Sequence, residues 1–236
     1  MTMPIANLSA GQTSRQTFDE ARPTDQQPSL RLLTAAEYEQ MIAAGIFNED
    51  DRVELLEGVM VAMSPKGMKH ATSTDRAARY FIHLLGNRVI VRNQNPILLN
   101  DYSEPEPDLV LAAPEEHEYA YRHPASADIY LILEVADTTL AYDRNRKGLS
   151  YAESGIVQYL ILNVNEMEIE DYREPSADGY PRKQTYTAGE SFNLVAFPDT
   201  SIKVSDLLPP APKPSSQVTR NRRSAQAGKT RARKAR

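Results

Sequence analysis

The sequence predicts an α/β fold in which helices lie against a mixed central β-sheet. Three observations indicate this. Residues 129–136 form a nearly unbroken apolar run rich in β-favouring side chains, as in a strand buried on both faces. A helical pattern follows and ends at Gly155, where a glycine can close a helix. Residues 156–162 form a second apolar run, so the stretch predicts a strand–helix–strand unit around which the chain is organised.

A helix and a β-hairpin are expected at the start of the ordered chain. Thr34 and Glu37 have the spacing of a capping box, and Gly45 can end the helix that they begin. Two short runs, residues 52–56 and 59–63, are joined by a Glu-Gly pair, which is typical of a hairpin.

Further elements are expected on both sides of the central unit. An amphipathic pattern over residues 69–85 predicts a second helix. Residues 88–92 and 96–100 suggest a strand pair, and residues 109–113 predict another strand. After the unit, a turn leads into a strand at residues 167–172, and weak strands are expected from there to Pro210.

Length and composition predict one domain with two tails. The 236 residues suffice for a single substantial core. We expect residues 1–29 to be a disordered segment, residues 30–208 to form the domain, and residues 209–236 to be a disordered basic tail. The absence of cysteine excludes disulfides and thiolate metal sites. No apolar run approaches the ~20 residues of a membrane span and no signal peptide is evident, so we expect no membrane partner and a cytoplasmic location.

The net charge of −5 is divided unevenly along the chain. Residues 211–236 carry nine basic side chains and no acidic one. The remaining residues, 1–210, carry 18 basic and 32 acidic side chains, a charge of −14. Such a tail is typical of contact with nucleic acid, although a solvated tail that only keeps the protein soluble explains it equally well.

Two carboxylates, Asp108 and Glu134, are the main candidate site residues. Each lies at the edge of an apolar run, and their separation permits two adjacent strands in one sheet. Carboxylates ~4 Å apart repel by about 4 kcal/mol at an effective dielectric of ~20, and a divalent cation removes that repulsion. Hard oxygen ligands favour Mg²⁺ or Mn²⁺. In a purely structural alternative, Asp108 caps a turn and Glu134 pairs with an arginine.

Lys147 is the candidate cationic residue. It has four-residue spacing to Asp143 and Tyr151, so the three share one helix face. Its ammonium can lie near a metal and a scissile phosphate, or it can face solvent and pair with Asp143. Glu54 is either a third acid or an exposed hairpin residue, and His70 is either a substrate-facing imidazole or polar surface.

Four separated segments carry a resemblance to a known family. They are VELLEGVMVAMSP with His70 after it, then PEPDLVLA, then LILEVAD, and then DRNRKGLSYAESGIVQYLILN. In this order they resemble the Uma family of restriction endonucleases, which belongs to the PD-(D/E)XK nuclease superfamily. The resemblance covers roughly residues 32–205, nearly the whole predicted domain.

The resemblance implies a restriction-endonuclease-like fold and a metal-dependent site. It implies that Asp108 and Glu134 bind Mg²⁺ or Mn²⁺ together with the backbone carbonyl of Val135. The superfamily has a lysine two residues after the glutamate, where this chain has Ala136; Lys147, on the adjacent helix, would replace it.

Glu54 and Tyr151 fall on family positions without an equally clear role, and with His70 they are possible additional site residues. Two further positions depart from the family. Asp137 stands where the family usually shows serine, and Leu160 where it often shows tryptophan.

The expected function is metal-dependent hydrolysis of phosphodiester bonds in DNA by an endodeoxyribonuclease. Two alternatives stay open: a nucleic-acid-binding module that has lost cleavage, and a non-catalytic interaction protein that uses its basic tail. The binding module would keep salt-dependent DNA affinity without magnesium-dependent turnover, and the interaction protein would show neither. DNA is the expected partner, and a homodimer is left open.

Overall fold

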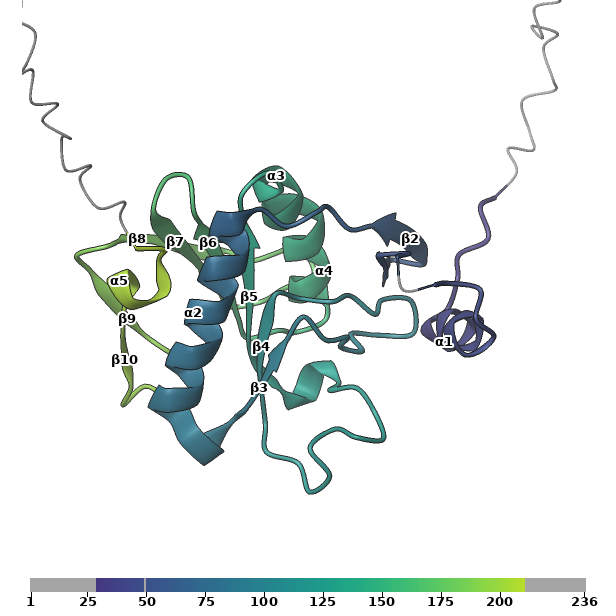
Figure 1. Ribbon diagram of the computed structural model, residues 1–236, viewed down its shortest axis with the longest axis horizontal. Helices are drawn as coiled ribbons and strands as arrows, with labels where there is room; N and C mark the ends of the chain where they lie inside the picture. The colour runs from purple at the N-terminus through teal and green to yellow at the C-terminus, as the bar shows by residue number, and fades with distance from the viewer. Residues whose placement is uncertain (1–28, 49, 211–236) are drawn as a thin grey trace, which may run out of the picture. The chain divides into compact units, whose positions relative to one another are not determined.

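The computed structural model describes residues 29–48 and 50–210 (Figure 1). Almost all of the two predicted tails therefore lies outside the described residues. The chain divides into two units with a boundary after Leu32, and the second unit is described below through its described residues, 33–48 and 50–210.

The second unit is built on a six-stranded mixed sheet, which confirms the predicted α/β class. All neighbouring strands are antiparallel except β5 and β6, which are parallel. The strands lie side by side in chain order: β3 (Ile90–Asn93), β4 (Leu109–Ala112), β5 (Ile129–Ala136), β6 (Gln158–Asn163), β7 (Glu168–Arg173) and β8 (Arg182–Thr187).

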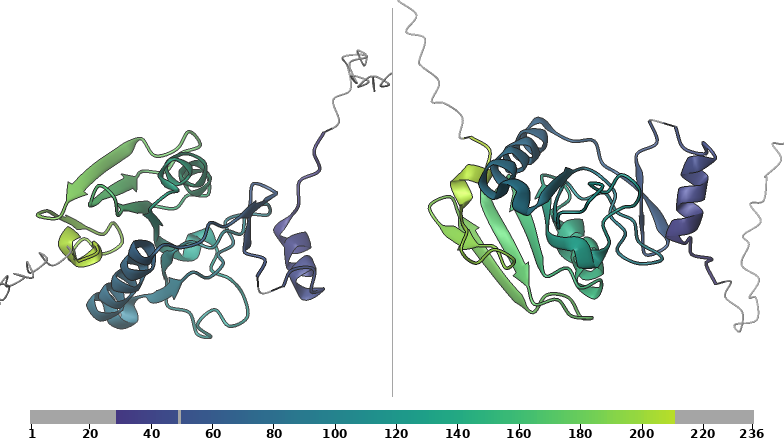
Figure 2. Two further views of the ribbon diagram at one scale, coloured as in Figure 1. Left: turned by 45° about the horizontal axis from the view of Figure 1, so that its top comes forward. Right: turned by 90° about the horizontal axis from the view of Figure 1, so that it is seen from below.

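Strand β5 is buried because both faces of the sheet are covered. Successive side chains of a strand point to opposite faces. Leu131, Leu133 and Val135 pack in one apolar cluster with residues of helix α2 (Met68–Leu85). Ile132 and Ala136 pack in a second cluster, with residues of the helix that connects β5 to β6. Figures 1 and 2 show helices on both sides of this strand. By the same alternation, Glu134 belongs to the second face.

The connection between β5 and β6 is a continuous helical run, as predicted, but it is not a uniform α-helix. It begins as α3 (Leu140–Tyr142), widens into a π turn labelled η3 (Asp143–Lys147), and ends as α4 (Gly148–Glu153). The Tyr159 hydroxyl donates to the Asp143 carbonyl at 3.1 Å, which supplies that carbonyl with a side-chain donor. Single π turns are frequent where side chains must be aimed at a functional site.

The predicted N-terminal helix and hairpin are also present. Helix α1 (Ala35–Ala43) begins with the expected capping box. The hairpin consists of β1 (Val53–Leu56) and β2 (Val59–Ala62), paired antiparallel as a separate two-stranded sheet. Helix α2 also lies where the amphipathic pattern predicts it.

The predicted strand pair at residues 88–92 and 96–100 is wrong. Only the first segment forms a strand, and this strand, β3, pairs with β4 instead. The second segment makes isolated bridges at Leu98 and Asn100. Its first residue, Pro96, has no N–H to donate to a ladder, whereas β4 offers β3 four consecutive partners.

The remaining elements are short. β9 (Ser191–Asn193) and β10 (Ser201–Lys203) form a second two-stranded sheet, followed by helix α5 (Val204–Leu207), which the sequence did not indicate. Two 3-10 turns, η1 (Gly86–Arg88) and η2 (Ser126–Asp128), complete the described chain. Among the described residues, no helix is both long and apolar enough to cross a membrane.

Candidate active site

A cavity of about 460 Å³ opens between the hairpin, the start of α2, the edge of β4 and β5, and the crossover helix. Concave pockets with a few convergent polar groups are the usual location of binding and catalytic sites. Here acids predominate, since six acidic residues line the cavity against two lysines and one histidine. The acidic and basic lining residues are Glu54, Glu106, Asp108, Glu134, Asp137, Asp143, Lys66, Lys147 and His70.

Asp108 and Glu134 meet at the wall of this cavity. Leu109 of β4 pairs with Leu133 of β5, and the two strands are antiparallel. Asp108, directly before β4, therefore lies beside Glu134, near the end of β5. The Asp108 N–H donates to Glu134 Oε2 at 3.2 Å, and the Val135 N–H donates to Asp108 Oδ2 at 2.9 Å. The two apolar runs whose edges carry these carboxylates are therefore adjacent strands, as the separation of Asp108 and Glu134 permits.

Lys147 and Tyr151 approach Glu134 from the crossover helix. Lys147 Nζ lies 2.9 Å from Glu134 Oε1, and the Tyr151 hydroxyl donates to the same oxygen at 2.7 Å. Both side chains are buried, so the solvent-facing alternative for Lys147 is wrong. Asp143 is not its hydrogen-bond partner in the structure, because the Asp143 carboxylate accepts from Thr139 Oγ1 at 2.6 Å. The alternative in which Glu134 pairs with an arginine is also wrong, because its cationic partner is Lys147.

Glu54 joins this cluster from β1. Its Oε1 lies 3.3 Å from Lys147 Nζ, and its Oε2 accepts from the Glu106 N–H at 3.1 Å. Glu54 is only 3% exposed, so the expectation of an exposed hairpin residue is wrong. Glu54, Leu55 and Leu56 are all buried, so both faces of β1 are covered, and a carboxylate there needs a cation such as Lys147.

Burial and charge shift the titration of this cluster. Burial raises the pKa of Glu134 to about 8, against the opposing effect of the Lys147 ammonium. Burial lowers the pKa of Lys147, but the carboxylates of Glu134 and Glu54 outweigh it and hold that pKa above its ordinary value. Lys147 is therefore protonated at neutral pH. The single Lys147 ammonium is paired with the carboxylates of both Glu54 and Glu134, so the cluster has more acidic than basic groups.

Asp108 is held by a different set of partners. His70 Nε2 lies 2.9 Å from Asp108 Oδ2, and Lys66 Nζ lies 3.6 Å from Oδ1. Burial raises the pKa of Asp108, but His70, the Val135 N–H and Lys66 together bring it below its usual value. Asp108 is therefore an ionised carboxylate, and His70 lies inside the cavity lining.

Comparison with known proteins identifies the family. The model of a family described as "Uma2: Putative restriction endonuclease" matches residues 35–205. This chain belongs to the Uma2 family. Membership supports a nuclease function. A search of curated proteins found no match.

A solved structure supports the fold of this Uma2 protein. It is titled "Crystal structure of a putative nuclease belonging to DUF820 from Anabaena variabilis ATCC 29413 at 1.96 A resolution". The alignment has a TM-score of 0.58 and 14% sequence identity, and it covers 74% of this chain and 97% of the other. At this identity the likeness shows a shared fold.

The family positions that differ in this Uma2 chain have clear places in the structure. Ala136, where the superfamily lysine is expected, packs in the apolar cluster on the face that carries Glu134. Lys147 brings an ammonium to Glu134 from the crossover helix instead. Asp137 lines the cavity, and Leu160 packs in the cluster beneath α2.

Several cavity residues were not singled out by sequence reasoning. Lys66 follows the Ser-Pro pair that ends the hairpin, and Tyr142 has a buried hydroxyl without a hydrogen-bond partner among the described residues. Glu106 also lines the cavity. Asp143 lines it too, although the sequence indicated it only as a helical partner of Lys147.

The site residues fit a divalent cation. Asp108 and Glu134 offer hard oxygen donors, the kind preferred by Mg²⁺ and Mn²⁺. The cavity lining has more acids than bases, and burial raises the pKa of Glu134, which a cation bound beside it would lower again. Val135 places its N–H on Asp108. The role of its carbonyl as a metal ligand stays a prediction.

Proposed function

We propose that this Uma2 protein is a divalent-cation-dependent endonuclease of the PD-(D/E)XK type that hydrolyses phosphodiester bonds in DNA. One observation carries the proposal. Asp108 directly precedes β4, Glu134 belongs to β5 and Lys147 to the crossover helix, yet at one cavity Glu134 accepts from both the Asp108 N–H and the Lys147 ammonium. Family membership supports the same class of reaction.

Asp108, Glu134 and the Val135 carbonyl would hold the cation. When bound, Mg²⁺ or Mn²⁺ polarises the phosphate and lowers the pKa of the attacking water. Lys147 keeps its proton at neutral pH, so its ammonium offsets the negative charge that develops on the phosphate, or orients the attacking water. Tyr151 and Glu54 hold the pair of Lys147 and Glu134 in position. The Tyr151 hydroxyl donates to Glu134, and the Glu54 carboxylate pairs with Lys147.

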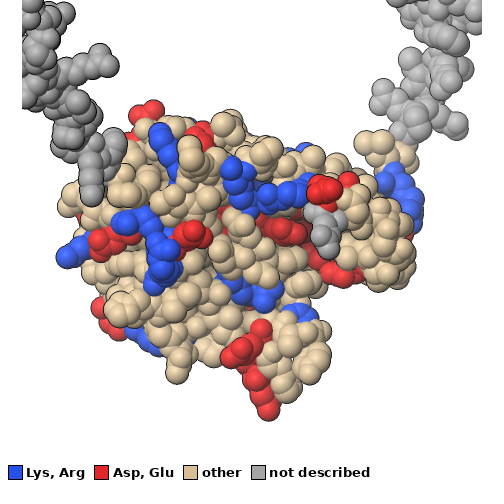
Figure 3. Space-filling view, viewed as in Figure 1, with Lys and Arg blue, Asp and Glu red and all other residues tan. Residues whose placement is uncertain are grey.

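Binding of a polyanion must depend on local positive charge. Residues 1–210 carry −14, so a nucleic acid is repelled overall. Figure 3 shows basic and acidic side chains interspersed on the face in view, rather than a continuous basic surface. At the cavity, Lys66 and His70 lie beside Asp108 and are the described positive or protonatable groups nearest to it. A phosphate would therefore be held by these groups and the cation together.

A plasmid-nicking assay tests the proposal. Purified protein is incubated with supercoiled plasmid in Mg²⁺, in Mn²⁺ and with a chelator. We expect nicked and then linear DNA with either cation and intact plasmid with the chelator. Parallel reactions with single-stranded DNA and with RNA test the choice of substrate. Binding of DNA without cleavage in either cation would contradict the enzyme and identify a binding module.

The basic tail leads to a separate prediction. Each phosphate that the tail neutralises on duplex DNA contributes about −0.9 to the slope of log affinity against log salt. Deletion of residues 211–236 removes nine positive charges, so we expect weaker DNA binding and a flatter slope, with metal-dependent cleavage retained. Affinity of both proteins is measured across a salt series in the presence of a chelator, so that cleavage does not interfere.

The opposite result has a physical explanation as well. Charges within a screening length of ~10 Å attract at moderate salt, so a tail bound to the acidic body would compete with DNA. In that case deletion would leave affinity equal or improved. An unchanged slope would exclude the tail from DNA binding.

A further inference from the structure

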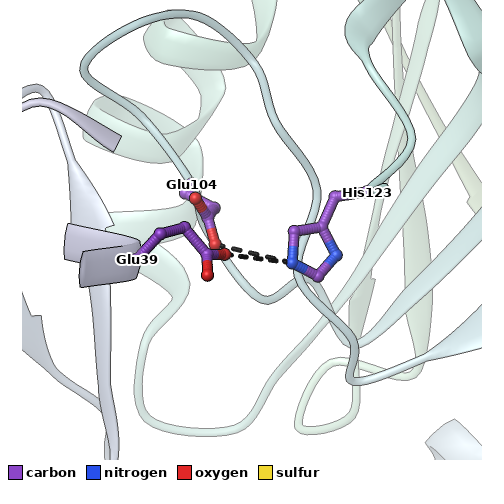
Figure 4. Close-up of side chains that lie close together, drawn as sticks. All are labelled: Glu39, Glu104 and His123. Atoms are coloured by element: carbon purple, nitrogen blue, oxygen red, sulfur yellow. Dashed lines mark hydrogen bonds and ion pairs between the residues drawn. The ribbon is translucent and has the colours of Figure 1, made fainter. Parts of the chain in front are cut away.

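A second group of chemically matched side chains lies outside the lining of the cavity. Glu39 belongs to α1, Glu104 to the segment that leads to β4, and His123 to the segment before η2. One ligand atom from each lies within 4.8 Å of the other two. Figure 4 shows the three side chains pointing toward one another from separate parts of the chain.

The hydrogen bonds within the group leave Glu104 Oε1 without a donor. His123 Nε2 lies 3.2 Å from Glu39 Oε1, a hydrogen-bond distance, but 3.7 Å from Glu104 Oε1, which is too long for one. A single proton on Nε2 can serve only one of the two oxygens well. Glu104 is 3% exposed, and its Oε1 has no hydrogen-bond partner among the described residues. A buried carboxylate oxygen that faces another carboxylate is stabilised either by a proton that the two acids share or by a bound cation.

The backbone holds each member of the group in place. Glu104 is bridged to Leu55 of β1, with its N–H donating at 2.8 Å and its carbonyl accepting at 3.3 Å. Helix α1 is anchored beside Glu39 by the Tyr38 hydroxyl, which donates to the Val53 carbonyl at 2.9 Å. The Pro124 carbonyl next to His123 accepts from the Leu98 N–H at 2.9 Å. The three side chains are therefore presented by fixed segments, as a metal site requires.

We propose that Glu39, Glu104 and His123 bind a divalent transition metal, and that Zn²⁺ is the ion that they fit best. Zinc takes imidazole nitrogen and carboxylate oxygen at about 2.0–2.2 Å, which places tetrahedral donors roughly 3.4 Å apart. The two measured separations lie on either side of this value. Magnesium is disfavoured because it prefers oxygen donors only. The exposure of Glu39 leaves room for a water as the fourth ligand.

The group holds two acids and one imidazole, so its carboxylates outnumber its cationic group. A bound metal would replace the missing positive charge and fasten α1 to the segment that carries Glu104. That segment also carries Glu106, whose N–H donates to Glu54 in the candidate active site. The ion is therefore expected to stabilise the fold beside the active site without taking part in the reaction.

Zinc titration of the metal-free protein tests the site. Calorimetry provides the Zn²⁺ affinity, and thermal unfolding is then measured at about 100 times the dissociation constant. We expect a rise in Tm of roughly 5–10 °C for the wild type. Glu104→Gln and Glu39→Gln should each weaken Zn²⁺ binding at least about 10-fold and remove most of the shift. Glu39 lies on the exposed face of α1, so this variant keeps the fold even if the buried one does not.

A control variant separates this site from other zinc ligands. His117→Ala removes an exposed histidine of the loop that also carries His123. This variant should keep the zinc-dependent shift. The proposal is overturned if the wild type shows no zinc-dependent shift, or if Glu39→Gln and Glu104→Gln bind Zn²⁺ as tightly as the wild type. None of these readouts depends on nuclease activity.

Discussion

Glu134→Gln is expected to reduce magnesium-dependent DNA cleavage by at least about 100-fold while the protein stays folded. The substitution preserves shape but removes a negative charge from the proposed cation site. It also leaves an amide N–H₂ facing a donor, because Glu134 accepts from Lys147 and Tyr151 on one oxygen and from Asp108 on the other. That mismatch should reduce the free energy of unfolding by about 1–3 kcal/mol. Initial rates of plasmid nicking and a urea denaturation curve provide the two measurements.

The matched control is Glu170→Gln on β7. Glu170 is equally buried in the same sheet and is paired with Arg144 and Lys183, but it does not line the cavity. Its substitution should therefore reduce stability to a similar or greater extent and keep cleavage within a few-fold of the wild type. If Glu134→Gln cleaved as fast as the wild type, the activity would lie elsewhere in the protein or in a contaminant.

Lys147→Met is expected to destabilise the fold by about 3 kcal/mol as well as to abolish cleavage. Removal of one partner from a buried ion pair leaves the other charge uncompensated, and here both Glu134 and Glu54 lose their shared ammonium. Methionine keeps most of the volume of the lysine side chain, so the loss reports charge rather than packing. Urea denaturation at neutral pH, with and without Mg²⁺, measures it.

The same experiment examines the cation site from a second direction. A bound divalent cation would replace the missing positive charge, so Mg²⁺ should stabilise Lys147→Met more than it stabilises the wild type. Lys183→Met is the control, because Lys183 pairs with Glu170 at a half-exposed position where such a pair contributes about 0–1 kcal/mol. If Lys147→Met lowers the free energy of unfolding by less than about 1 kcal/mol and Mg²⁺ has no effect on it, the carboxylates of Glu134 and Glu54 take up protons instead of binding a cation.

The local elements of this protein were predictable because each leaves a short-range signal. The apolar run of β5, the capping box of α1 and the amphipathic period of α2 follow from side-chain patterns within a few residues. The pairing of β4 with β5 could be inferred from two apolar runs with carboxylates at their edges. The wrong strand pair near Pro96 shows the limit of such signals, since β3 took the longer ladder that β4 offers.

The composition of the site divides in the same way. Asp108, Glu134 and Lys147 stood out in the sequence, two as carboxylates at the edges of apolar runs and one by helical spacing, and the fold brings them together. Burial of Glu54 and the contact of His70 with Asp108 had no such signal, because each depends on how the hairpin and α2 pack against the sheet. The same holds for residues that meet from distant segments of the chain. Lys66 and Tyr142 meet in the lining of the cavity, and Glu39, Glu104 and His123 meet in the second group.

The sequence by itself determined the α/β class and the central strand–helix–strand unit, and it singled out Asp108, Glu134 and Lys147 as the main candidate site residues. These depend on hydrophobic periodicity and on the cost of burying a charge, both of which are properties of neighbouring residues. Only the tertiary structure decided which further side chains share the cavity and which form a second cluster. Contacts between distant segments are set by the packing of whole elements, and a side chain's sequence neighbours do not record which element will face it.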